Sequence, residues 1–387
     1  MNTLYSFFML LLIGGELNLN LNGISDNAPS RSEQYTSIEV NSDSLDAWIG
    51  RKLMIGFRGL SVSESDHVLR DLKEYQVGGI ILFDYDVPTQ MPLRNIESPD
   101  QVKSLITELK TAASTNLLIA VDQEGGRVAR LKETRGFFRG RSAEALSTLF
   151  STAPDSVLDE VEEQAFQLAT LGFNVNFAPV VDVNVNPANP VIGSLGRSFS
   201  NNPKKVVEMA GITLSALRDA GLIGVLKHYP GHGSSMNDSH LGVTEVTQTW
   251  NESELIPYRD LIDSGHAKAI MSAHVFHAGL DSLYPGTLSY AVNTTLLRKD
   301  LRFEGVLFSD DLQMGAIRDQ FSLEETVIMA VNSGVDVLVF GNNSIYDAEI
   351  VPKVHRILRQ AVENGVIDAA LLRESSDRIE RLLRDLE

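Results

Sequence analysis

Eight short apolar runs recur along the chain, separated by segments with a helical pattern, and this alternation narrows the choice of fold more than any other feature. Runs of about four to eight apolar residues bounded by Gly, Pro, Asn or Asp are typical of buried strands. Most of the runs do not alternate apolar with polar residues, as expected for parallel strands that are covered on both faces. The stretch with Asn174 and Asn176 is the exception. The eight predicted strands span residues 53–57, 79–83, 117–121, 175–181, 224–226, 269–272, 305–308 and 335–340.

The segments between these runs indicate helices. Residues 66–75, 206–217 and 379–386 carry apolar side chains at helical spacing, and Ser98 places a capping hydroxyl before Pro99. Eight strand–helix alternations predict an α/β fold, specifically a (β/α)₈ TIM barrel that forms a single catalytic domain over residues 46–387. An open, doubly wound sheet is the alternative, because a sequence does not show whether a sheet closes.

Composition excludes several function classes. The 387 residues are 43% hydrophobic and 22% charged, enough for a sizeable core. A formal net charge of −18 argues against nucleic acid as a partner, since phosphate binding needs a concentrated basic surface. The chain has no cysteine, which excludes disulfides, thiolate metal sites and cysteine nucleophiles.

Residues 1–45 differ in composition from the rest and are interpreted as a leader, a possible signal segment followed by a linker. The apolar run at 7–13 is too short for a stable membrane span, which needs about 20 residues. It resembles the core of a signal peptide, although neither a preceding Lys or Arg nor a small-x-small cleavage site accompanies it. We therefore expect export, to the periplasm or medium, rather than a cytoplasmic location.

Polar residues follow the predicted strands directly. In a (β/α)₈ barrel the active site is built at the C-terminal ends of the strands, so chemistry is expected at these positions. Because charged groups next to core strands are costly unless they are paired, their recurrence at one end indicates a polar cavity. They are Asp122 to Arg127, Asp182 to Asn184, Lys227 with His228, His274, and Asp310 with Asp311.

The segment from Lys227 to His240 gathers most of the histidines of this region around a Pro-Gly-His-Gly turn. Asp238 lies two positions before His240, close enough to orient the imidazole and to raise its pKa above about 6.5, which would make His240 a proton donor near neutrality. One alternative is a polar surface turn. Another is a metal site made by His228, His232, His240 and Asp238, although Lys227 would repel a cation.

An apolar strand delivers Asp310 into the expected cavity, where a carboxylate can attack an anomeric carbon or stabilise an oxocarbenium-like transition state. Asp311 would point elsewhere, and capping of the following helix is the alternative for this pair. Side chains suited to sugar hydroxyls are Asp122, Arg127, Arg130 and Arg197, although each alone is more often part of a structural ion pair.

Four segments resemble motifs of glycoside hydrolase family 3, in particular its single-domain β-N-acetylhexosaminidases of the NagZ type. They are residues 121–130, residues 196–199, the Lys-His-Tyr-Pro-Gly-His-Gly stretch at 227–233 with Asp-Ser-His at 238–240, and residues 308–312. The resemblance extends from about Trp48 to the C-terminus. The stretch at 227–240 is highly specific, whereas the arginine positions are supporting evidence.

This resemblance implies a (β/α)₈ barrel without metal or organic cofactor. It implies Asp310 as nucleophile and His240 as acid/base assisted by Asp238. It further implies that a non-reducing N-acetylglucosamine is bound by Asp122, Arg130, Arg197, Lys227 and His228. The implied reaction is retaining, through a covalent glycosyl-Asp intermediate, and the small carbohydrate substrates are peptidoglycan fragments or chito-oligosaccharides.

Two expectations accompany this hypothesis. We expect a monomer, and we expect the Asp238–His240 pair to approach Asp310 only when its loop closes. The leader before about Trp48 departs from the cytoplasmic members of the type, which generally lack one. The alternatives are a family 3 exo-glycosidase acting on another β-linked sugar, such as glucose, and a barrel that binds carbohydrate without turnover.

Overall fold

The computed structural model describes residues 42–64, 66–239 and 242–386, and these residues contain a barrel of eight parallel strands. Each strand pairs with the next one along the chain, and β12 pairs with β1. A parallel bridge between Phe308 and Val337 joins the two remaining edges. The fold prediction is confirmed. The barrel strands are β1 (Leu53–Ile55), β2 (Gly79–Ile81), β3 (Leu118–Val121), β6 (Val175–Asn176), β7 (Ile223–Tyr229), β9 (Ala269–Ser272), β11 (Val306–Ser309) and β12 (Leu338–Phe340).

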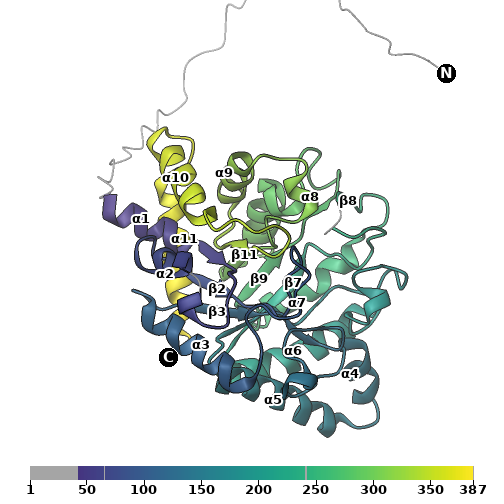
Figure 1. Ribbon diagram of the computed structural model, residues 1–387. Coiled ribbons are helices and arrows are strands. Elements are labelled where there is room, and N and C mark those ends of the chain that lie inside the picture. The colour runs from purple at the N-terminus through teal and green to yellow at the C-terminus, as the bar shows by residue number, and fades with distance from the viewer. Residues whose placement is uncertain (1–41, 65, 240–241, 387) are drawn as a thin grey trace, which may run out of the picture. The chain divides into compact units, whose positions relative to one another are not determined.

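Helices cover the outside of these strands, as α3, α5 and α6 do in Figure 1. They are α1 (Ser42–Arg51), α2 (Asp66–Lys73), α3 (Pro99–Ala112), α4 (Ala143–Phe150), α5 (Pro154–Leu171), α6 (Pro203–Asp219), α7 (Ile256–Asp263), α8 (Gly315–Arg318), α9 (Leu323–Ser333), α10 (Ile350–Glu363) and α11 (Ala369–Arg384). A π-helix, Ala291–Asp300, lies between β9 and β11. The capping prediction is confirmed at α3, where the Ser98 side chain accepts a hydrogen bond from the Gln101 N–H. None of the described helices is both long and apolar enough to span a membrane.

Side chains along each strand alternate between two cores. Leu53 and Ile55 of β1 pack against the helices, whereas Met54 belongs to the core that fills the barrel. The same alternation places Phe177 and Phe308 inside, with their rings 5.6 Å apart between centroids. Inward side chains of small barrels fill the interior, so this one is packed rather than open.

Helix α11 closes the N-terminal end of the barrel. Its apolar face contributes Ile379, Leu382 and Leu383 to the inner core. Beside it, Asp336 is fully buried and forms ion pairs with Arg298 (2.5 Å) and Arg378 (2.9 Å). With this end closed, the opposite end is the one at which polar side chains can meet a ligand.

The fourth predicted strand is shorter than expected, because β6 comprises Val175–Asn176 rather than residues 175–181. Pro179 has no N–H to donate to a neighbouring strand. The Asn176 side chain instead accepts from the Gln123 N–H (3.1 Å) and donates to the Gln123 carbonyl (3.0 Å). Pairing with β7 resumes at a single bridge between Val180 and Lys227.

Short strands that the sequence did not predict lie outside the barrel. β4 (Gln123–Gly125) pairs with β5 (Val128–Ala129), and β8 (Thr244–Glu245) pairs with β10 (Val275–Phe276). Both small sheets are formed by segments that follow barrel strands. They therefore help to shape the C-terminal face of the barrel.

Candidate active site

The C-terminal ends of five barrel strands carry the polar side chains of the predicted site. This agrees with the position at which (β/α)₈ barrels build their active sites. The residues are Asp122 after β3, Asp182 beyond β6, Lys227 and His228 in β7, His274 after β9, and Asp310 after β11.

Lys227 links two carboxylates. Its side chain is 3% exposed, and its Nζ lies 2.8 Å from Asp122 Oδ1 and 2.7 Å from Glu124 Oε1. Burial by itself would lower the pKa of Lys227, but the charges of Asp122 and Glu124 outweigh burial and raise it. The ammonium group therefore stays charged and holds both carboxylates in place.

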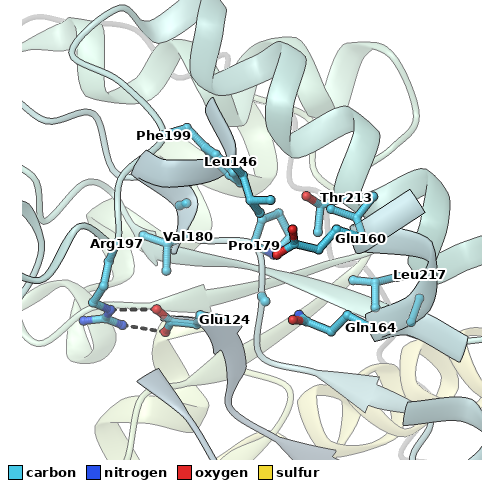
Figure 2. Close-up of a pocket in the computed structure, with 15 residues that line it drawn as sticks. Glu124, Leu146, Glu160, Gln164, Pro179, Val180, Arg197, Phe199, Thr213 and Leu217 are labelled. Carbon is cyan, nitrogen blue, oxygen red and sulfur yellow. Dashed lines mark hydrogen bonds and ion pairs between the residues drawn. The ribbon is translucent and has the colours of Figure 1, made fainter. Parts of the chain in front are cut away.

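Glu124 also forms a two-point ion pair with Arg197, drawn with dashed lines in Figure 2. Both N–O distances are 2.7 Å, and Arg197 in addition donates to the Val191 carbonyl at 2.8 Å. Burial opposes ionisation of Glu124, but Arg197 and Lys227 lower its pKa to about 2. A planar guanidinium held at both ends is well oriented for donating to a ligand oxygen.

Asp122 lies on the more open side of this network, with 17% of its side chain exposed. Arg130 lies 3.4 Å from its second oxygen and is itself 30% exposed. Burial alone would raise the pKa of Asp122, yet Lys227 and then Arg130 lower it. Asp122 is thus an ionised carboxylate within reach of solvent, suited to accept hydrogen bonds from sugar hydroxyls.

His228 is oriented by Asp182. Its Nδ1 lies 2.6 Å from Asp182 Oδ2, and its backbone N–H donates to Asp182 Oδ1. Arg197 Nη2 lies 3.3 Å from the other ring nitrogen, Nε2. Because Arg197 only donates, the proton of the ring is assigned to Nδ1 and Nε2 is the acceptor.

The two adjacent aspartates after β11 have different environments. Asp311 Oδ1 accepts hydrogen bonds from the N–H groups of Gln313 (3.0 Å) and Gly341 (3.1 Å). A Cβ at Gly341 would lie 2.7 Å from Asp311 Oδ2, so the glycine makes room for this carboxylate. Asp311 therefore stabilises the turn that follows β11. The alternative that it caps the following helix is wrong, because the N-cap of α8 is Met314.

Asp310 is half-buried at the end of β11, and its N–H donates to the Ser272 carbonyl of β9. Its Oδ1 accepts from the Asp311 N–H at 2.8 Å. His274 completes this region. Its two ring nitrogens lie 2.8 Å from Thr287 Oγ1 and 2.9 Å from the Asp311 carbonyl, so His274 connects the segments that follow β9 and β11.

The loop after β7 begins with a tightly held stem, residues 231–235. The N–H groups of Gly233 (2.9 Å) and Ser234 (3.3 Å) donate to Glu254 Oε2. A Cβ on Gly233 would lie 1.8 Å from the Val183 carbonyl, so only glycine fits there. Glu254 is fully buried, and burial raises its pKa to about 7 despite these hydrogen bonds.

Beyond the stem, the loop turns back towards β11. Ser239 is 3% exposed, and its carbonyl accepts a hydrogen bond from the Ala316 N–H at 3.3 Å. Asp238 is half-buried beside it. His240 lies outside the described residues, so the predicted Asp238–His240 pair and its approach to Asp310 stay predictions.

The alternative of a metal site concerned four side chains of this loop. In the described ranges, which leave out residues 240 and 241, no three His, Asp or Glu side chains gather with the arrangement of metal ligands. His228 is instead engaged by Asp182, and His232 contacts Ser239.

A small cavity of about 30 Å³ lies behind the Glu124–Arg197 pair, between the barrel and helices α4, α5 and α6 (Figure 2). Leu146, Gln164, Thr213 and Leu217 point into it. Ligand sites usually measure about 300–1,000 Å³, whereas a cavity of this size holds about one or two water molecules. It belongs to the packing of the helices against the barrel.

Sequence reasoning assigned roles to Asp122, Lys227 and His228 but none to the carboxylates that organise them, which it placed only among the polar residues that follow the strands. Glu124 and Asp182 both follow predicted strands, and that position was the available signal. Glu254 gave no such signal, because it lies on a helical turn and reaches the stem through a contact between distant segments.

Comparison with known proteins gives consistent results. Residues 44–382 match the family model described as the glycosyl hydrolase family 3 N terminal domain. The chain is 33% identical over 371 residues to Beta-hexosaminidase A of Pseudoalteromonas piscicida, covering 86% of this chain and 60% of that protein. It is 34% identical to a Beta-hexosaminidase of Nitrosomonas eutropha, covering 75% of this chain and 80% of that protein.

Among solved structures, a glycoside hydrolase family 3 beta-N-acetylglucosaminidase from Paenibacillus sp. superposes with a TM-score of 0.79 and 32% identity. The similarity covers 88% of this chain and 62% of that one. The chain thus spans less than two thirds of the length of two of these three relatives.

Proposed function

Since the chain belongs to glycoside hydrolase family 3, we propose that it is a β-N-acetylhexosaminidase that removes a terminal, non-reducing N-acetylhexosamine with retention of configuration. The observation that carries the proposal is the network of Asp122, Glu124, Lys227 and Arg197 on the same barrel face as Asp310. The names of the relatives, β-hexosaminidase and β-N-acetylglucosaminidase, support this substrate class.

In this proposal the network binds the sugar before any bond breaks. Asp122 accepts hydrogen bonds from ring hydroxyls, while Lys227, Arg130, Arg197 and His228 face the sugar oxygens and the acetamido group. Fixed charges of both signs suit a ligand that is neutral but rich in hydroxyls. Because these groups are already paired with one another, they need little rearrangement when the sugar binds.

The reaction then proceeds in two displacements. The Asp310 carboxylate attacks the anomeric carbon while His240, assisted by Asp238, protonates the departing glycosidic oxygen. His240 next removes a proton from water, which attacks the glycosyl–Asp310 ester and regenerates the carboxylate. Two inversions at the anomeric carbon give net retention. The two reaction steps need neither an oxidant nor an organic cofactor.

The deciding experiment compares p-nitrophenyl N-acetyl-β-glucosaminide with p-nitrophenyl β-glucoside as substrates of the full chain. We expect hydrolysis of the first and little of the second, and activity that persists in a chelator. A clear preference for the glucoside would contradict the hexosaminidase assignment. Binding of N-acetylglucosamine without turnover of any β-glycoside would leave only a binding function.

Two further measurements test the mechanism. Proton NMR should show the β-anomer of the released sugar first, whereas initial release of the α-anomer would indicate inversion. A 5-fluoro N-acetylglucosaminyl fluoride should add one sugar mass to the peptide that contains Asp310, and Asp310→Ala should show neither labelling nor turnover.

Peptidoglycan fragments and chito-oligosaccharides are the two natural substrate classes that we propose. Hydrolysis of N,N′-diacetylchitobiose and of an N-acetylglucosaminyl–N-acetylmuramic acid disaccharide, measured side by side, separates them. Export, a proposal that rests on the composition of residues 1–45, is tested by locating the protein in cell fractions.

A further inference from the structure

His232 is a buried histidine of the predicted loop motif to which the mechanism above gives no role. Its side chain is enclosed, with 3% of the residue exposed. Its backbone N–H donates to Asp182 Oδ1 at 2.8 Å, and its ring meets that of His228 edge-on with centroids 5.7 Å apart. His232 is therefore joined to Asp182 and to His228, which faces the sugar in the proposed reaction, yet it lies in the stem of the loop.

The ring of His232 reaches the far part of the same loop. Its Nε2 lies 3.1 Å from Ser239 Oγ, so the stem contacts the residue that immediately precedes position 240. Ser239 is held from the other side by Ala316, which follows β11 and Asp310 in the chain. Ser239 thus lies between the His232 imidazole and the segment after β11, and Asp238 precedes it in the chain.

The stem that carries this imidazole is itself fixed. Asn189 donates to the His232 carbonyl at 2.7 Å, and Glu254 accepts from the next two N–H groups along the chain. An imidazole with such an immobile backbone places its Nε2 at a defined point.

The chemistry of the ring suits a fixed hydrogen bond. Burial, followed by the proximity of His228, lowers the pKa of His232 to about 4, so the ring is neutral at neutral pH. Its Nδ1 has no hydrogen-bond partner among the described residues. Because a buried N–H without an acceptor is unfavourable, we assign the proton to Nε2, which donates to Ser239 Oγ.

We propose that His232 is a positioning residue, which holds Ser239 and thereby the adjacent Asp238, the residue that assists proton transfer to the leaving group of the bound sugar. The inference rests on the proposed function, since it concerns the proton-transfer step of that reaction. His232 touches neither substrate nor reacting atoms in this proposal and acts only through the loop.

The test uses the full chain with two substrates that differ in leaving group. Release of 2,4-dinitrophenolate needs no proton, whereas cleavage of N,N′-diacetylchitobiose does. An ordinary hydrogen bond corresponds to about a threefold to tenfold change in an equilibrium. We expect His232→Phe to lower kcat/KM for chitobiose by about this factor and to leave kcat/KM for the dinitrophenyl glycoside unchanged.

Two other variants isolate the hydrogen bond. His232→Gln keeps an N–H near the position of Nε2 and should recover most of the lost activity. Ser239→Ala should match His232→Phe, and the double variant should be no worse than either single one, because both remove the same contact. Ser235→Ala, which removes another buried hydroxyl of this loop, is the matched control and should leave the ratio of the two substrates unaltered.

The possible outcomes are distinct. Equal losses with both leaving groups, or additive effects of the two positions, would overturn the role of His232 while leaving the proposed function intact. If His232→Phe does not fold, the two substrates are compared with Ser239→Ala and His232→Gln instead, and a selective loss for chitobiose in Ser239→Ala alone supports the role of His232. Inhibition by N-acetylglucosamine reports on the sugar site and should be the same in all variants. A wild-type protein without β-N-acetylhexosaminidase activity would overturn both proposals.

Discussion

Replacing the buried carboxyl of Glu254 by an amide should make the protein more stable at alkaline pH. Glu254 is fully enclosed, and its Oε2 accepts two N–H groups from the loop stem. Burial raises its pKa from 4.5 to about 7. The folded protein therefore binds this proton more tightly than the unfolded chain does, so stability falls as the pH rises from about 4.5 to about 7.

The size of the effect follows from the two pKa values. Each tenfold change in a proton-binding constant corresponds to about 1.4 kcal/mol. The difference between 4.5 and about 7 thus amounts to about 3 kcal/mol of unfolding free energy, fully lost above pH 7. Glu254→Gln keeps an acceptor oxygen for the stem but has no proton to lose. It should lie within about 1 kcal/mol of the wild type near pH 5 and exceed it by up to about 3 kcal/mol at pH 8.

Urea unfolding of both proteins between pH 5 and pH 8, followed by circular dichroism, measures this difference directly. All other titrating groups are shared, so their contributions cancel in the comparison. Glu252→Gln, which removes an exposed carboxylate from the same helical turn, controls for the change in net charge. A Glu254→Gln protein whose stability follows the wild-type pH profile, or which is the weaker of the two at pH 8, would refute the reasoning.

Three other substitutions test separate parts of the site. Glu124→Gln removes the charge that Arg197 and Lys227 share, so the free energy of unfolding in urea should fall by about 3–5 kcal/mol. The KM should also rise, and an unchanged KM would exclude a role of Glu124 in sugar binding. Gly341→Ala places a methyl group 2.7 Å from a carboxylate oxygen of Asp311, so the free energy of unfolding should fall by about 1–3 kcal/mol. A melting temperature equal to that of the wild type would contradict this. His240→Ala should lower kcat about 10²–10⁴-fold in steady-state assays, and full activity would exclude its role in proton transfer.

The fold was predictable because its signals are local. Strand β9 lies at the predicted residues, and Ser98 caps α3 as its position before Pro99 indicates. The length of β6 was not predictable in the same way, since it depends on how Asn176 meets the backbone of a neighbouring strand. Apolar runs identify strands. The residue at which hydrogen bonding between two strands stops depends on the neighbouring strand as well.

The site was predictable in part for a related reason. Asp122 and Lys227 follow or end apolar strands, and the structure joins them at 2.8 Å. The partners that fix such residues are often far away in sequence, as Glu254 is from the barrel ends. The role of a buried carboxyl such as Glu254 becomes clear only from the three-dimensional structure, which shows the segment that it contacts.

Two asparagines, Asn176 in β6 and Asn174 just before it, have a consequence for how the barrel wall opens. Asn174 accepts from the Ile119 N–H, and Asn176 accepts from the Gln123 N–H, so two backbone amides of the adjoining segment are hydrogen-bonded to side chains. In an ordinary ladder the acceptor is a carbonyl, which every amino acid supplies. Here a point mutation can remove it. The rate of local opening in this part of the barrel wall therefore depends on two side chains, which selection can change. In segments paired through backbone groups alone, proline is the substitution that removes a hydrogen bond of the ladder.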